Sequence, residues 1–146
     1  MIRALDASEI SSAAFRHLVW LAAELEEVDV TRLIDTELPH LTVQGMVSDG
    51  EVRGFIALAE TPHRITVEYI AVATDAQGQG LGRRFIEEAR RIADGRAVFA
   101  ETDDDAVDFY RRLGFTIAES APDPRWPERR RYACTRAVEP QGAAIG

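Results

Sequence analysis

The first part of the chain shows a helical spacing of apolar residues. After Ser8 they recur every third or fourth position, which places them on one face of a helix. The recurring positions are Phe15, Leu18, Val19, Ala22 and Leu25. Residues 2–5 predict a short strand before this helix, and residues 28–38 predict a second helical segment after it. That segment is expected to end at Pro39, whose ring disfavours a helical conformation in the preceding residue.

The next part of the chain has the pattern of paired strands. Residues 41–47 and 52–58 are rich in apolar side chains and flank Ser48-Asp49-Gly50-Glu51. Asp-Gly favours a tight turn between antiparallel strands because both turn positions tolerate a positive φ. Residues 65–73 are mostly β-branched or apolar, which predicts a third and largely buried strand.

The second half of the chain alternates helices with short strands. A helical apolar face begins at Leu81, and the helix is expected to end at Asp94-Gly95. The members of that face are Leu81, Phe85, Ile86, Ala89, Ile92 and Ala93. The later patterns predict a strand, a helix closed by Gly114 and two final strands. These elements cover residues 97–100, 105–113, 115–118 and 131–138.

The order of these elements predicts an α+β or α/β domain, with a mixed sheet that carries helices on its faces. No internal repeat and no linker rich in Ser, Gly or Pro divides the chain. We therefore expect a single domain over residues 1–139, followed by a flexible tail over residues 140–146.

Composition narrows the classes of function. The chain has 146 residues, of which 46% are hydrophobic and 29% charged, with a formal net charge of -8. It contains no apolar run long enough to span a membrane and no signal-peptide pattern, so a cytoplasmic protein without membrane contact is expected. One cysteine and three scattered histidines favour neither a metal site nor a disulfide scaffold. The acidic balance argues against nucleic acid as a partner and mildly favours a cationic acceptor.

A glycine-rich turn joins the buried strand to the following helix. Its sequence is Gln77-Gly78-Gln79-Gly80-Leu81-Gly82, and Arg83 and Arg84 follow directly. Glycines let a ligand approach the backbone closely, and the free amides and positive dipole end of a helix attract phosphate. The spacing fits neither the Walker loop nor the full dinucleotide fingerprint. From these residues alone, a phosphate cradle and a simple tight turn both remain open.

Two spaced motifs resemble those of the GNAT superfamily of N-acetyltransferases. Ile70-Ala71-Val72 followed by Gln77-x-x-Gly80-x-Gly82 is similar to its acetyl-CoA signature, Gln/Arg-x-x-Gly-x-Gly/Ala. About thirty residues later, Ala106-x-x-Phe109-Tyr110-x-x-x-Gly114-Phe115 resembles its second signature. The order of the predicted elements resembles the superfamily's fold along nearly the whole chain.

This resemblance implies a mixed, mostly antiparallel sheet that is splayed open at the acetyl-CoA site. The splay would lie where the strand ending at Val72 leaves a neighbour that starts near Ala97. Pantetheine and the thioester would contact the backbone of Ile70, Ala71 and Val72. The pyrophosphate would contact the turn and the first helical amides, through Gln77, Gly78, Gln79, Gly80, Leu81, Gly82 and Arg83. Phe109 and Arg112 would make further contacts to the coenzyme.

Tyr110 is the candidate general acid for the departing thiolate. It shares a helical face with Ala106, Phe109 and Leu113, so it is expected to point inward. A phenol of ordinary pKa ~10 donates to a thiolate whose thiol has a pKa of ~8.5, and full transfer in water costs about 2 kcal/mol. The alternative is a core tyrosine whose hydroxyl bonds to the backbone.

Glu68 and Glu101 are the candidate general bases, and a water molecule is the third alternative. Glu68 lies in the middle of a strand expected to be buried, where desolvation would raise its pKa. An ion pair between Glu68 and Arg53 or Arg64 is an equal alternative. Glu101 follows the next strand on its carboxyl side, where open α/β sheets place ligand groups.

Three other features favour structural roles. Asp103-Asp104-Asp105 is expected to cap the helix that follows, although the resembled family often has asparagine near Asp103. Cys134 is expected in the core, so transfer would be direct and would involve no covalent intermediate. The acceptor, a small-molecule or peptide amine, would be selected by residues 28–40 and by the loop 122–129 with Trp126.

Two rival functions stay open from the sequence. One is a non-catalytic module that binds CoA or acyl-CoA and regulates a partner, and the other is a structural or dimerisation domain with an empty turn. The resemblance also leaves open a homodimer formed through the last strands.

Overall fold

The computed structural model describes residues 1–23 and 27–137, so the tail predicted over 140–146 lies outside the described residues. The described part of the chain forms seven strands together with helices, which confirms the mixed fold class predicted from the sequence. The chain divides into two compact units. The first unit contains residues 1–60 and 67–89, and the second contains residues 61–66 and 90–146.

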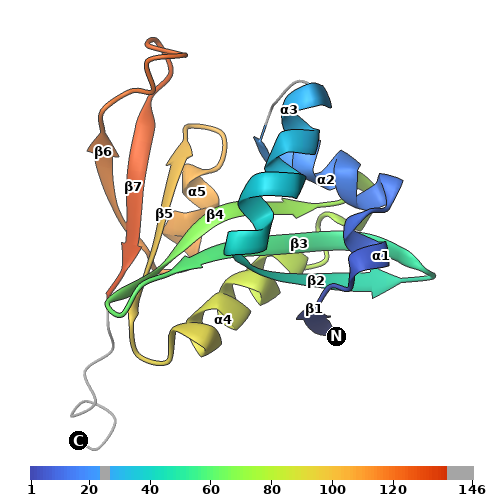
Figure 1. Ribbon diagram of the computed structural model, residues 1–146. Helices are drawn as coiled ribbons and strands as arrows, with labels where there is room; N and C mark the ends of the chain where they lie inside the picture. The colour runs from blue at the N-terminus through green and yellow to red at the C-terminus, as the bar shows by residue number, and fades with distance from the viewer. Residues whose placement is uncertain (24–26, 138–146) are drawn as a thin grey trace, which may run out of the picture. The chain divides into compact units, whose positions relative to one another are not determined.

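The first unit carries strands in the order β1-β2-β3-β4 (Figure 1). These strands are β1 (Ile2–Ala4), β2 (Thr42–Ser48), β3 (Glu51–Glu60) and β4 (Arg64–Val72). Its α-helices are α1 (Ala7–Ile10), α2 (Ala13–Ala23), α3 (Glu27–Arg32) and α4 (Leu81–Ala93). The first three residues of β4 and the last four of α4 belong to the second unit.

The hairpin predicted around Asp49-Gly50 is confirmed. Strands β2 and β3 pair antiparallel, with Ser48 opposite Glu51. The two turn residues have φ values of 52° and 77°, the left-handed conformation that a two-residue hairpin turn requires.

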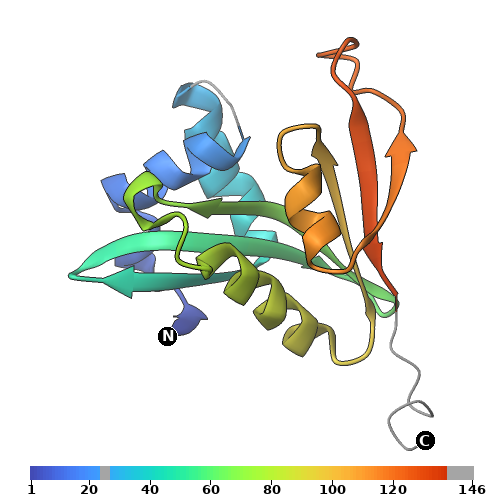
Figure 2. The same ribbon diagram turned by 180° about the vertical axis from the view of Figure 1, so that it is seen from behind.

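Helices cover both faces of the sheet in the first unit. Phe55 and Ala57 of β3 belong to a buried cluster with Phe15, Leu18 and Val19 of α2. Gly54 lies on the opposite face, against α4. Figures 1 and 2 show α2 and α3 on one side of β3 and β4, and α4 on the other. Strand β3 is therefore buried on both faces, which explains its nearly continuous apolar sequence.

Gly54 sets the distance between β3 and α4. A Cβ at this position would lie 2.8 Å from Phe85 Cε2, 3.1 Å from the Ala71 carbonyl oxygen and 3.2 Å from Leu81 Cδ2. Two of these atoms belong to well-packed side chains and one to the backbone, so the space cannot open without moving α4 or β4.

We expect Gly54→Ala to destabilise the protein by about 1–3 kcal/mol, because overpacking a close contact forces the neighbouring elements apart. Urea unfolding measures this change. The comparison variant is Gly45→Ala, where the nearest atoms all belong to the half-buried Leu5 side chain, so one side chain must shift and no backbone atom is among them. Equal losses in the two variants would contradict the role assigned to Gly54.

The helix predicted after Ser8 is interrupted. The structure has two helices, α1 and α2, separated at Ser11 and Ser12. Ser12 Oγ donates to the Glu9 carbonyl at 2.7 Å and accepts from the Phe15 amide at 3.2 Å. These local bonds replace helical ones, because serine side chains compete with the backbone for its donors and acceptors. Leu25, the last predicted member of the apolar face, lies outside the described residues.

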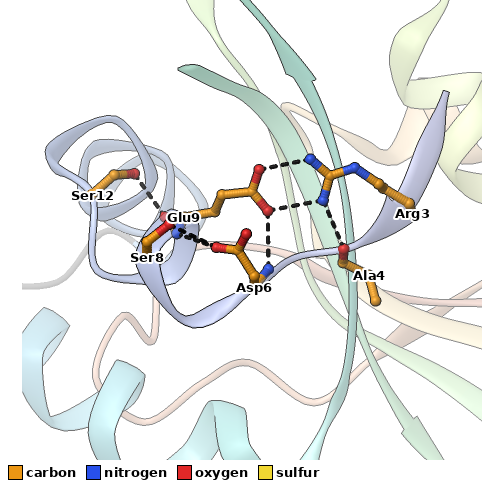
Figure 3. Close-up of polar contacts among 6 residues, drawn as sticks. All are labelled: Arg3, Ala4, Asp6, Ser8, Glu9 and Ser12. Carbon is orange, nitrogen blue, oxygen red and sulfur yellow. Dashed lines mark hydrogen bonds and ion pairs between the residues drawn. The ribbon is translucent and has the colours of Figure 1, made fainter. Parts of the chain in front are cut away.

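A capping box holds the start of α1 (Figure 3). Asp6 Oδ1 accepts from the Glu9 amide at 2.8 Å, and Glu9 Oε1 accepts from the Asp6 amide at 2.9 Å. Arg3 donates to both carboxylate oxygens of Glu9, at 2.8 and 2.7 Å. This bidentate contact, with the Asp6 amide, lowers the pKa of the Glu9 carboxyl to about 2. The pair therefore ties α1 to β1.

We expect Glu9→Gln to lower the melting temperature at pH 7 by roughly 2–4 °C. Because the pKa of Glu9 is lowered on folding, its contribution is complete above its ordinary value of 4.5 and is lost as the pH falls toward 2. The difference between variant and wild type should thus shrink over that range in thermal melts. Glu119→Gln, at an exposed carboxylate 3.7 Å from Arg130, serves as control. A pH-independent difference would contradict the contribution assigned to the ionised carboxylate.

The second predicted helical segment is less regular than expected. The α-helix α3 ends at Arg32 and continues as a π-helical turn, η1 (Leu33–Glu37), and a 3-10 turn, η2 (Leu38–His40). Pro39 lies inside η2 instead of ending the helical segment, because the first residues of a helical turn need no amide donor.

The second unit carries strands in the order β5-β7-β6, all paired antiparallel. Its elements are β5 (Ala97–Asp103), α5 (Val107–Arg112), β6 (Thr116–Ser120) and β7 (Arg131–Arg136). Strand β5 extends three residues beyond its predicted end. Gly114 closes α5 as predicted, with a φ of 88°. In the described part of the chain, no helix is long and apolar enough to cross a membrane.

Candidate active site

The glycine-rich turn lies between β4 and α4 in the first unit. A short 3-10 turn, η3 (Thr74–Ala76), leaves β4, and residues 77–80 that follow are exposed. Gly78 and Gly80 have φ values of 83° and 76°, and a Cβ at either position would meet nothing within 4 Å. Backbone conformation therefore requires these glycines, and the space above them is open to a ligand.

The start of α4 presents free amides beside this turn. The first intrahelical bond runs from the Arg84 amide to the Gly80 carbonyl at 3.1 Å. The amides of Leu81, Gly82 and Arg83 precede that bond and have no acceptor within the helix. With the positive dipole end of a 13-residue helix, they form a site suited to an anion such as pyrophosphate.

Gln77 turns back toward β4. Its side-chain Nε2 donates to the carbonyl of Val72 at 3.2 Å. This bond joins two residues for which the sequence resemblance predicts contacts to the coenzyme. The side chain of Gln77 thus braces the turn against the end of β4.

The three residues at the end of β4 differ in exposure. Ala71 is buried, and Ile70 and Val72 are half-buried. The end of β4 and the glycine turn lie in the same compact unit, so the predicted contacts to pantetheine and to pyrophosphate come from one unit.

Tyr110 is buried in the second unit, as its helical face predicts. Its side chain is 4% exposed and makes edge contacts with the rings of Phe109 and Phe115, at centroid distances of 5.1 and 5.3 Å. Among the described residues, the Tyr110 hydroxyl has no hydrogen-bond partner. The alternative of a core tyrosine bonded to backbone therefore has no support within the described chain.

Burial raises the pKa of the Tyr110 phenol, with a smaller contribution from Cys134. The phenol is therefore fully protonated near neutral pH, as a general acid must be. The same shift makes complete transfer of its proton less favourable than in water. A hydrogen bond donated to a developing negative charge suits this environment better than a free phenolate.

Phe109 and Arg112 lie on the same helix as Tyr110. Phe109 is half-buried, while Arg112 is exposed and its Nε donates to the Asp108 carbonyl at 3.3 Å. Both side chains belong to the second unit, whereas the glycine turn belongs to the first.

A family model settles what kind of protein carries these features. The model described as acetyltransferase (GNAT) family matches residues 6–115. The chain belongs to the acetyltransferase (GNAT) family.

One curated relative is similar to this chain in sequence, and two solved structures are similar to it in fold. The relative, a 5-NmdU N-acetyltransferase of Pseudomonas phage PaMx11, is 36% identical in an alignment of 76 residues that covers 48% of this chain and 54% of that protein. The chain thus spans about half the length of this relative. The fold resembles that of the Escherichia coli ribosomal-protein-S18-alanine N-acetyltransferase, with a TM-score of 0.71, 19% identity and coverage of 97% and 96%. It also resembles a GNAT acetyltransferase of Elizabethkingia anophelis with acetyl-CoA bound, with a TM-score of 0.73, 19% identity and coverage of 94% and 97%.

Both candidate bases of this GNAT chain are exposed. Glu68 lies on β4 between half-buried and buried neighbours, and Glu101 lies within β5 opposite Ala133 of β7. The expectation that Glu68 is buried was wrong, because alternation along β4 turns this side chain to solvent. Burial is therefore no longer an argument for Glu68 as the base. Glu101 lies inside β5 instead of beyond its end, because β5 runs to Asp103.

The expected capping role of the three aspartates was also wrong. Helix α5 begins at Val107, and its N-cap is Ala106, which makes no side-chain cap bond. Asp103 Oδ1 instead accepts from the Asp105 amide at 3.0 Å, and Asp103 Oδ2 lies 3.6 Å from Arg129 Nη1. These residues stabilise the β5–α5 turn and the neighbouring loop.

In the loop 122–129, two arginine side chains make cation–π contacts with the ring of Trp126. The guanidinium carbons of Arg125 and Arg129 lie 4.5 and 5.4 Å from the Trp126 ring centroid. Arg125 also pairs with Asp123 at 2.8 Å. The other predicted acceptor segment, residues 28–40, is tied to β4 through Glu37, which accepts from the Tyr69 hydroxyl at 2.7 Å.

Cys134 is fully buried, and burial raises the pKa of its thiol, as expected of a core residue. Within residues 1–23 and 27–137, no three His, Cys, Asp or Glu side chains lie close enough together to hold a metal ion.

Sequence reasoning missed an ion pair beside the glycine turn. Arg53 of β3 pairs with Asp75 of η3. The two residues are 22 positions apart, and no local motif marks either of them.

Proposed function

We propose that this chain is an N-acetyltransferase that moves an acetyl group from acetyl-CoA to a primary amine by direct attack. The observation that carries the proposal is the exposed turn of residues 77–80, whose two left-handed glycines lead into free amides at the start of α4. Amides from Gly78 to Arg83 would hold the pyrophosphate, and the backbone of Ile70, Ala71 and Val72 would hold the pantetheine. Gln77 would support both by its bond to Val72.

Acetyl-CoA supplies the acetyl group as a thioester. Residues of the chain would donate a proton to the departing sulfur and accept one from the amine. Tyr110 is the proposed donor toward the departing sulfur, because its buried phenol stays protonated. Glu68, Glu101 or a water molecule would accept the proton of the amine. Phe109 and Arg112, on the helix of Tyr110, would contact the coenzyme.

We propose one catalytic domain over residues 1–139. The family match over residues 6–115 includes parts of both compact units, which supports a single functional domain better than two.

The acceptor is proposed to be a small-molecule or peptide amine. The name of the phage relative makes 5-NmdU the first acceptor to assay, because that relative is 36% identical over the matched residues. The net charge of -8 favours a cationic amine in solution over an acceptor attached to nucleic acid. Residues 28–40 and the loop 122–129 are the proposed determinants of acceptor choice. We also propose testing for a homodimer formed through the last strands, by measuring the mass of the protein in solution.

A non-catalytic CoA-binding regulatory module is the second candidate. The raised pKa of Tyr110 is compatible with this candidate as well, since a phenol that resists ionisation is a weaker acid. This candidate keeps coenzyme binding and predicts no turnover with any amine.

Calorimetric titration with CoA and acetyl-CoA tests the proposal, followed by release of the CoA thiol in the presence of 5-NmdU and other amines. Binding with a Kd on the order of micromolar, about -8 kcal/mol, is expected. Binding with turnover supports the enzyme, and binding without turnover over a broad panel supports the regulatory module. No heat and no protection from thermal unfolding at millimolar CoA would refute both.

A further inference from the structure

Arg53 contacts the segment before the glycine turn at two points. Its backbone carbonyl accepts from the Ala73 amide at 2.8 Å, and its guanidinium pairs with the Asp75 carboxylate. The Arg53 side chain is only 23% exposed, so the surrounding residues restrict its conformations. Arg53 therefore contacts η3 both at its N-cap, Ala73, and at its middle residue, Asp75.

These two contacts of Arg53 hold the N-terminal end of the glycine turn, whereas α4 begins at its C-terminal end. Within η3 the Ala76 amide donates to the Ala73 carbonyl at 2.8 Å, and Ala76 is buried. Beyond Gln77 the chain is exposed through Gly80, and nothing lies within 4 Å of where a Cβ would be at either turn glycine. The conformation of such a turn depends on its two ends, because glycines do not restrict it. Helix α4 fixes one end, and the Arg53 contacts fix the other together with the bond from Gln77 to Val72.

We propose that Arg53 is a positioning residue for the coenzyme cradle: through Asp75 and Ala73 it holds the glycine turn in the conformation that receives pyrophosphate. This inference rests on the proposed function. Arg53 does not itself touch the ligand in this proposal. Its effect is preorganisation, in which a loop ordered beforehand loses less entropy when the ligand binds.

The simpler view is an ordinary surface ion pair. Asp75 is 74% exposed, and exposed pairs contribute little to stability. The two views predict different results. Loss of a surface pair should change the affinity for no ligand. Loss of a contact that orders the glycine turn should weaken the binding of ligands with a pyrophosphate and leave the binding of ligands without one unchanged.

The experiment compares CoA with pantetheine, which has no pyrophosphate. CoA affinity is measured by calorimetry and pantetheine affinity by ligand-observed NMR, for wild type, Arg53→Met and Asp75→Asn. We expect both variants to bind CoA about three- to tenfold more weakly, with pantetheine binding unchanged. Arg53→Lys, which retains the charge, should recover part of the loss. Glu51→Gln is the matched control, because Glu51 Oε2 lies 3.4 Å from Nη1 of the same guanidinium but Glu51 belongs to β3 and not to the turn segment.

Three outcomes would overturn the inference. Wild-type affinity for CoA in both variants would leave only a surface pair. Equal losses for CoA and pantetheine, accompanied by a lower melting temperature, would indicate a general structural role. If the wild type binds no CoA at all, the proposed function fails together with this inference, whereas the first two outcomes leave the proposed function intact.

Discussion

Gly80→Glu is expected to weaken CoA binding at least about 100-fold while the protein still folds. The new side chain would stand in open space, so it would meet no neighbouring atom of the protein. Its backbone would be strained, since a φ of 76° costs a residue with a Cβ roughly 1–2 kcal/mol. The larger effect is electrostatic, because a carboxylate would occupy the place where helix amides attract an anion. Calorimetry with CoA measures the loss, and circular dichroism checks the fold.

Gly50→Glu provides a close control for this variant. Gly50 has a φ of 77°, and a Cβ there would also meet nothing within 4 Å. It lies in the β2–β3 hairpin, so the same backbone strain and the same new charge are placed outside the turn itself. We expect a similar change in melting temperature and no change in CoA affinity. If both variants bind CoA with wild-type affinity, the glycine turn does not bind the pyrophosphate, and the proposed coenzyme site is refuted.

Tyr110→Phe is expected to lower turnover by about 10²-fold with an acceptor amine, at little change in the KM for acetyl-CoA. The substitution removes one oxygen and keeps the edge contacts with Phe109 and Phe115. Because the hydroxyl has no partner among the described residues, its removal leaves no polar group of this part of the chain unsatisfied. Steady-state kinetics and a thermal melt together separate loss of chemistry from loss of fold.

The pH dependence gives a second test of Tyr110. Since burial raises its pKa above the ordinary value of 10, an alkaline loss of turnover caused by this phenol must begin above pH 10. The raised pKa also means that the unfolded state releases the proton first, so stability falls as the pH rises above 10. Tyr110→Phe should remove that part of the decline. For turnover, Tyr132→Phe is the control, because the Tyr132 hydroxyl donates to Asp104 at 2.5 Å and is assigned no role in turnover. It is not a control for stability, because the bond to Asp104 raises the pKa of Tyr132 too. An unchanged rate in Tyr110→Phe would return this residue to the core and favour the regulatory module.

Local sequence patterns determined much of this protein. Asp49-Gly50 predicted the hairpin because the turn conformation is a property of those two residues. The glycine turn and the inward face of Tyr110 followed in the same way, since glycine spacing and helical periodicity act over a few residues. Each of these features depends on interactions between positions that are close in sequence.

Other features were decided only when distant segments met. Glu68 is exposed although its strand is apolar, because burial of a strand residue depends on what covers its face. The aspartates before α5 do not cap it, because β5 extends to Asp103 and Asp103 is used in the turn itself. The closeness of Arg53 to Asp75 arises because the Ala73 amide bonds to the Arg53 carbonyl, which brings η3 beside β3. The sequence by itself thus determined the elements and the glycine turn through short-range preferences, whereas tertiary packing decided which charged groups lie beside that turn.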